Sequence, residues 1–181
     1  MRMPRKYITF LILLLALAGC SSPPPLRQAV LWDWEASEAL RLALTRLGCP
    51  YVLGAQGPWQ FDCSGLVVWA YRQAYPALRF LDESSNVVDD ATADILWRYN
   101  VERITPANAR PGDLVFLTWT PGRVAHVGLF RRWLGEGVFE LVHASSYHGM
   151  VVAEPWSLTE PGRMWLVGLG RLRTVTGLPL H

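Results

Sequence analysis

The hydrophobic residues of this chain follow two different spacings. Between residues 34 and 47 they recur every three or four positions, which is typical of a helix that buries one face. The residues on that face are Ala36, Ala39, Leu40, Ala43, Leu44 and Leu47. Gly48 and Pro50 predict the end of this helix. The pattern also indicates a helix over 63–74, with Asp62 at its N-cap, and a shorter helix around 91–99.

The second half of the chain is typical of strands. After Pro111-Gly112, short runs rich in Val, Phe and Trp are separated by Gly, Pro and charged residues, and they predict strands over 114–119, 124–131, 138–144, 150–153 and 165–172. Helices followed by strands favour an α+β domain with a mainly antiparallel sheet. No internal repeat is visible. We therefore expect one domain over 34–173 and a C-terminal tail over 174–181.

The N-terminus has the layout of a secretory signal. Arg2, Arg5 and Lys6 precede an uncharged apolar run over 8–18, which is short for a membrane span of about 20 residues. The run ends in Leu17-Ala18-Gly19-Cys20, which resembles a bacterial lipobox. We expect a signal peptide over 1–19, a lipidated Cys20 and a Pro-rich tether over 20–33. The alternative is an ordinary cleaved signal in which Cys20 is incidental.

Charge and cysteine content narrow the function classes. The formal net charge is +2, but without the three basic residues of the signal the chain has 14 basic and 15 acidic residues, so nothing favours nucleic-acid binding. Three cysteines are present. In an exported protein, two cysteines such as Cys49 and Cys63 could form a disulfide. We expect both to be reduced, because a disulfide would prevent the Cys63 thiol from reacting. We interpret Cys49 as a packing residue.

Cys63 and two later histidines suggest a cysteine hydrolase. Cys63 lies at a predicted helix start, where exposed N–H groups favour a thiolate. His126 and His143 follow on predicted strands, in the order of a thiol, a base and an orienting residue. His148 is an alternative third residue, in a predicted turn. Without its flanking residues, Cys63 would instead be interpreted as a buried structural cysteine.

The motifs around these residues resemble the NlpC/P60 family of cell-wall peptidases. The matching segments are 50–54 (Pro50-Tyr51-Val52-Leu53-Gly54), 61–67 (Phe61-Asp62-Cys63-Ser64-Gly65-Leu66-Val67), 111–116 (Pro111-Gly112-Asp113-Leu114-Val115-Phe116), 126–128 (His126-Val127-Gly128) and 143–145 (His143-Ala144-Ser145). Ala55 departs from the pattern, since a second glycine is usual there. The resemblance covers roughly residues 35–155.

The resemblance implies a papain-like fold and hydrolysis of peptide bonds in peptidoglycan stem peptides or crosslinks, near a diamino acid. Cys63 would be the nucleophile, His126 the base and His143 the orienting residue. Tyr51 would be a candidate oxyanion donor, and Asp62 and Ser64 would bind the stem peptide on the acyl side. We interpret Asp113 as structural, with its carboxylate bonding local backbone.

No cofactor or metal site is expected, because the histidines lack close ligand spacing and no paired Cys-x-x-Cys is present. The expected partners are stem peptides and, through the lipid anchor, a membrane. We expect a monomer in the bacterial cell envelope, on the outer membrane facing the periplasm if the source is Gram-negative. Two other functions stay open: an inactive muropeptide-binding or partner-binding lipoprotein of the same fold, and acyl transfer or amidase chemistry on lipids.

The nine tryptophans raise the question of sugar binding. We expect core packing for Trp32, Trp34, Trp69, Trp97 and Trp165, which lie near predicted apolar faces. Trp59 and Trp119 lie in predicted loops near the proposed cleft and are better candidates for lining a groove. A glycosidase normally needs two carboxylates that flank the bond, and no such pair is evident, so cleavage of the sugar backbone is not expected.

Overall fold

A computed structural model describes residues 26–159 and 164–176. Its helices are α1 (Asp33–Leu44), α2 (Cys63–Ala74), α3 (Ala93–Tyr99) and the 3-10 turn η2 (Pro106–Asn108). Its strands are β1 (Arg27–Val30), β2 (Phe80–Leu81), β3 (Val87–Val88), β4 (Val101–Ile104), β5 (Leu114–Thr118), β6 (His126–Gly135), β7 (Val138–Ser145), β8 (Met150–Ser157) and β9 (Trp165–Thr176). The predicted α+β class is confirmed. The predicted signal peptide and Cys20 lie outside the described residues.

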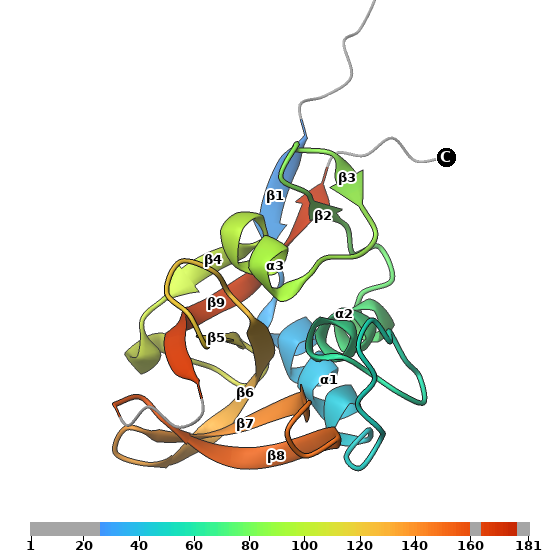
Figure 1. Cartoon of the computed structure of the whole chain (residues 1–181). Helices are drawn as coiled ribbons and strands as arrows, with labels where there is room; N and C mark the ends of the chain where they lie inside the picture. Colours follow the sequence, from blue (N-terminus) through green and yellow to red (C-terminus); the bar gives the residue numbers. More distant parts are fainter. Residues whose placement is uncertain (1–25, 160–163, 177–181) are drawn as a thin grey trace, which may run out of the picture.

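The main sheet has the strand order β1-β9-β5-β6-β7-β8, and β4 also pairs with β9. All of its pairings are antiparallel. Helices α1 and α2 pack together and lie against β6 and β7 (Figure 1). β5 is buried on both faces: Leu114 and Phe116 face the helices, while Val115 and Leu117 join a second apolar cluster.

Helix α2 is confirmed with the predicted bounds. Its buried face includes Leu66, Val67, Ala70 and Tyr71, and the Tyr71 hydroxyl donates a 2.8 Å hydrogen bond to the Gly112 carbonyl. This bond joins the helix to the turn that enters β5. The C-terminal half of α2 is therefore tied to the sheet.

Two domain boundaries predicted from the sequence are wrong. β1 lies within the predicted tether, and β9 extends into the predicted tail, to Thr176. The two strands pair from Arg27↔Thr176 to Val30↔Arg173 (Figure 1). Each segment supplies the backbone partners of the other, and the short polar strand Arg27–Val30 has no hydrophobic alternation that would predict it.

The first helix is shorter than predicted. It ends at Leu44 rather than residue 47, and Leu47 is exposed. The chain turns away because Gly48 N donates to Val151 O and Val151 N donates to Cys49 O, so tertiary pairing with β8 replaces another helical turn. Pairing also extends β6 and β8 beyond their apolar runs, to Gly135 and Ser157.

The expected core packing of five tryptophans is right for two of them and wrong for three. Trp69 and Trp97 pack against the main core cluster. Trp32, Trp34 and Trp165 are 74 %, 62 % and 51 % exposed, so the prediction is wrong for them. Trp32 is the N-cap of α1 and Trp34 is its second residue, and neither belongs to the buried face of the helix.

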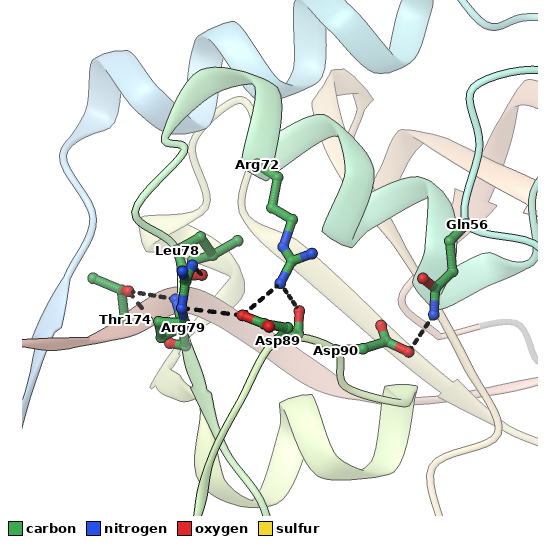
Figure 2. Close-up of polar contacts among 7 residues, drawn as sticks. All are labelled: Gln56, Arg72, Leu78, Arg79, Asp89, Asp90 and Thr174. Atoms are coloured by element: carbon green, nitrogen blue, oxygen red, sulfur yellow. Dashed lines mark hydrogen bonds and ion pairs between the residues drawn. The ribbon is translucent and has the colours of Figure 1, made fainter. Parts of the chain in front are cut away.

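The segment between α2 and α3 is held by a polar cluster (Figure 2). Asp89 forms ion pairs with Arg72 of α2, at 3.2 Å, and with Arg79, at 3.0 Å. Next to Asp89 in the chain, Asp90 accepts a hydrogen bond from the amide of Gln56. Gln56 lies in the loop that leads to Cys63, so the cluster connects that loop to the body of the domain. The Asp89 carboxylate is 69% exposed, and each of these contacts is therefore worth little by itself.

Among the described residues, no helix is long and apolar enough to span a membrane.

Candidate active site

Asp62 fixes the start of α2, where Cys63 is the first helical residue. Asp62 Oδ1 accepts hydrogen bonds from Gly65 N, at 2.6 Å, and from Ser64 Oγ, at 3.1 Å. Its Oδ2 accepts from Gly54 N at 2.9 Å. The predicted N-cap is confirmed, and the same carboxylate joins the preceding loop to the helix.

Gly65 allows that loop to approach the helix closely. A Cβ atom at this position would lie 2.1 Å from the carbonyl oxygen of Ala55. That oxygen accepts a 2.8 Å hydrogen bond from Asp62 N, and Ala55 N donates to Val52 O. Ala55, where the family pattern has glycine, therefore sits in a regularly hydrogen-bonded loop.

The Cys63 thiol lies between the start of α2 and strand β6. Burial raises its pKa to about 11, and the negative charge of Asp62 acts in the same direction. The backbone N–H groups of Val127, Ser64 and Cys63 oppose this rise. Val127 directly follows His126, so its contact brings the thiol to the strand that carries His126. Cys49 and Cys63 are both free thiols, as expected.

His126 and His143 meet inside the sheet. His126 Nε2 lies 2.6 Å from His143 Nδ1, and their side chains are buried. Gly128 provides the room on β6, because a Cβ there would lie 2.8 Å from the Cβ of His143. Burial, followed by the neighbouring His143, lowers the pKa of His126. The imidazole of His126 is therefore neutral at neutral pH and can accept a proton.

The polar chain continues beyond His143 to two residues that were not predicted in these roles. His143 Nε2 lies 3.0 Å from Oε1 of Glu154, and His148 Nε2 lies 2.9 Å from Oε2 of the same carboxylate. His148 thus contacts Glu154, while His143 occupies the position next to His126. Glu154 was missed because its strand was predicted to end at residue 153.

Tyr51 lies beside the thiol. Burial raises the pKa of its hydroxyl, and negative charge on Cys63 and Asp62 raises it further, which reflects their proximity. Its backbone is held on both sides: Tyr51 N donates to Gly149 O at 2.8 Å, and a β-bridge joins Tyr51 to Phe61. This segment therefore connects the β7–β8 turn to the approach to Cys63.

A cavity of about 240 Å³ opens beside the two histidines. It is lined by Trp119, His126, His143, Ser145, Ser146, Tyr147, Glu154, Trp156 and Met164. Trp119 is thus found next to the site, as expected, whereas Trp59 is exposed and does not line this cavity. Asp113 has the expected structural environment: its carboxylate accepts from Arg110 N, at 2.7 Å, and from Arg171 Nε, at 3.2 Å.

The NlpC/P60 family model matches residues 48–161, which is more than half of the chain. The chain belongs to the NlpC/P60 family. The matched region contains the Cys63 loop, both buried histidines and Glu154. In the part of the chain that the structure describes, no group of three His, Cys, Asp or Glu side chains is arranged to hold a metal ion.

Curated proteins that are similar in sequence have hydrolase names. A probable endopeptidase of Mycobacterium tuberculosis is 31% identical over 127 residues, covering 70% of this chain and 28% of its own length. Gamma-DL-glutamyl hydrolase of Bacillus subtilis is 32% identical over 87 residues, covering 46% of this chain and 18% of its own length. The chain thus spans less than a third of these relatives.

Solved NlpC/P60 structures share the fold. NlpC1 of Trichomonas vaginalis superposes with a TM-score of 0.57 at 27% identity, covering 81% of this chain and 47% of the other. A Staphylococcus aureus protein described as similar to lipoprotein, of the NLP/P60 family, gives 0.56 at 25% identity, covering 84% and 44%. The expected papain-like NlpC/P60 fold is confirmed.

Proposed function

We propose that this protein is a cysteine endopeptidase that hydrolyses peptide bonds in peptidoglycan stem peptides or crosslinks, near a diamino acid. The observation that carries the proposal is the placement of the Cys63 thiol. It lies at the N-terminus of α2 and against the N–H of Val127, the residue that follows His126 in β6, and the buried His126 ring contacts His143 at 2.6 Å. This is the arrangement of a nucleophile, a base and an orienting residue.

The first half of the proposed reaction forms a thioester. The Cys63 sulfur attacks the carbonyl carbon of the scissile amide while the thiol proton moves to His126. Because burial keeps the thiol protonated and the imidazole neutral, this proton transfer accompanies the attack. The C–N bond then breaks, and the leaving amine takes the proton from His126.

The second half of the reaction restores the enzyme. Water gives a proton to His126 and attacks the thioester carbonyl, and His126 returns that proton to the departing sulfur. Backbone N–H groups at the start of α2 and the Tyr51 hydroxyl are the donors that we assign to the oxyanion. His143 keeps the His126 ring in position through both halves.

Asp62 and Ser64 are proposed to bind the acyl side of the stem peptide. In the structure Asp62 already has a structural task, because it accepts hydrogen bonds from Gly54, Ser64 and Gly65. Each carboxylate oxygen has more than one acceptor site, so a substrate donor can be added without displacing these bonds. The cavity beside His126 is the proposed place for the leaving side of the substrate.

The names of the relatives support the reaction class. One is a probable endopeptidase and another a gamma-DL-glutamyl hydrolase. The alternative of an inactive muropeptide-binding protein has less support, since Cys63 is a free thiol and His126 contacts His143.

Digestion of purified sacculi by the full-length protein tests the proposal. Mass spectrometry of the soluble products should show new free amino groups at stem-peptide cleavage sites and no new reducing sugar ends. A Cys63→Ala protein is the matched control and should release nothing. New reducing ends that depend on Cys63 would contradict the assignment.

We further propose that the protein is attached to a bacterial envelope membrane through a lipid on Cys20. The support is the sequence pattern of a basic n-region, an apolar run and the Leu17-Ala18-Gly19-Cys20 segment. Metabolic labelling with a fatty-acid probe should mark the wild type and not Cys20→Ala. Equal labelling of both proteins would refute the anchor.

A further inference from the structure

A line of hydrogen bonds leads away from His126 across the sheet. His126 Nε2 lies 2.6 Å from His143 Nδ1, and His143 Nε2 lies 3.0 Å from Glu154 Oε1. The three residues come from the adjacent strands β6, β7 and β8. Val152 is directly opposite His143 in the register, so Glu154 is its diagonal neighbour on the same face of the sheet.

The Glu154 carboxylate determines which ring nitrogen of His143 is protonated. The hydrogen bond from His143, with that from His148, holds the pKa of Glu154 at about 2, so at neutral pH Glu154 only accepts hydrogen bonds. His143 must therefore present a protonated Nε2 to it. The opposite tautomer would place a nitrogen lone pair 3.0 Å from a carboxylate oxygen, which is repulsive.

The same logic fixes the tautomer of His126. We take His143 as neutral in this arrangement; a neutral imidazole has one N–H, so a His143 protonated on Nε2 has a bare Nδ1 that accepts a hydrogen bond. His126 must then donate from Nε2, which leaves its own Nδ1 unprotonated. That nitrogen is the one free to take the thiol proton, because Nε2 is occupied by His143.

We propose that Glu154 is a positioning residue, which sets the tautomer of the base His126 through His143. The proposal rests on the proposed peptidase function for its kinetic consequence, but the tautomer itself does not depend on activity. Nothing in the NlpC/P60 motifs described above includes Glu154.

His148 has a supporting role in the same arrangement. It lies 2.9 Å from the second oxygen of Glu154 and is 34% exposed, while the Glu154 side chain is 20% exposed. Its ring also packs edge to face on Tyr147, with centroids 5.0 Å apart. His148 thus keeps both carboxylate oxygens engaged and restrains Glu154 from turning toward solvent.

The test combines nitrogen NMR with kinetics. In wild-type protein labelled with [15N]histidine, imidazole spectra should show a protonated Nε2 and an unprotonated Nδ1 for both His126 and His143. Glu154→Leu should let His143 populate the other tautomer and should lower kcat at least about tenfold with little change in KM, because a misplaced base proton blocks proton transfer.

Two further variants separate this role from a general structural one. In Glu154→Gln the amide oxygen can still accept a hydrogen bond from His143 while the amide NH2 faces His148. His126 and His143 should therefore keep their wild-type tautomers, and most of the wild-type kcat should be retained. Glu140→Leu is the matched control: Glu140 is on the neighbouring strand and pairs with Arg131 and Arg132 instead of a histidine. It should change neither the tautomers nor kcat.

Each outcome decides the proposal. A wild-type His126 protonated on Nδ1 overturns it, whether or not the variants fold. Wild-type tautomers and kcat in Glu154→Leu overturn it as well. If the wild-type protein cleaves no peptide at all, the proposed function fails, and the wild-type and Glu154→Leu NMR spectra still decide whether Glu154 sets the tautomer.

Discussion

The Nδ1 atom of His143 lies 2.6 Å from the Nε2 atom of His126, and the two rings meet edge to face with an interplanar angle of 90°. Both side chains are buried, so this contact is protected from water. A buried histidine pair of this kind holds one imidazole in a single orientation. We therefore expect substitutions of the two residues to lower kcat by different amounts.

Removing the two imidazoles should have graded effects. His126→Ala should reduce kcat by about 10²- to 10⁴-fold, because proton transfer to and from the sulfur is lost. His143→Asn should be milder, since the asparagine oxygen can accept the hydrogen bond from His126. Steady-state cleavage of a purified muropeptide measures both. Equal loss in the two variants would show that His143 does more than orient.

The thiol should react faster as the pH rises well above neutrality. Burial places the pKa of Cys63 at about 11, so the reactive thiolate fraction should keep growing between pH 7 and pH 10. The rate of iodoacetamide labelling, measured in a Cys49→Ala background, should show no plateau in that range. Asp62→Asn should shift the profile toward lower pH, because it removes a negative charge that raises the thiol pKa. A plateau near pH 7 would contradict the neutral thiol.

Tyr51→Phe should separate catalysis from binding. If the hydroxyl stabilises the oxyanion, its removal should lower kcat by about a hundredfold and leave KM almost unchanged. Tyr99→Phe, on α3, is the control and should leave kcat and KM unchanged. A wild-type kcat in Tyr51→Phe would show that the hydroxyl does not stabilise the oxyanion and that Tyr51 is a packing residue.

Gly65→Ala should destabilise the domain despite the better helix propensity of alanine. The new Cβ would lie 2.1 Å from Ala55 O, and relieving that clash with backbone should cost about 1–3 kcal/mol in the free energy of unfolding. Urea denaturation measures this difference. Gly135→Ala is the matched control, because its Cβ would meet no atom within 4 Å, and it should stay within about 0.5 kcal/mol of wild type.

Local chemistry made much of this site predictable from the sequence. The spacing around Asp62 and Cys63 predicts a capped helix, because an N-cap carboxylate and the following helical run are encoded within a few residues. His126 and His143 could be ordered by their flanking motifs. Their strands could be recognised by short runs of Val, Phe and Leu.

The missed features depend on contacts between distant segments. Glu154 gains its place from an antiparallel register with β7, which no local pattern specifies. The strand Arg27–Val30 forms because residues 173–176 supply its partners. Leu47 leaves the predicted helix because Gly48 pairs with Val151. In each case tertiary hydrogen bonding outweighs the local preference.

The central claim is that the Cys63 sulfur carries the acyl group of a cleaved stem peptide. Mass spectrometry of the acid-quenched reaction with a muropeptide tests it most directly. We predict that the mass of the acyl fragment is found on the peptide containing Cys63 in wild type and in Cys49→Ala, and that Cys63→Ala shows neither this adduct nor product. Undiminished cleavage by Cys63→Ala, or an adduct on another residue, would contradict the account.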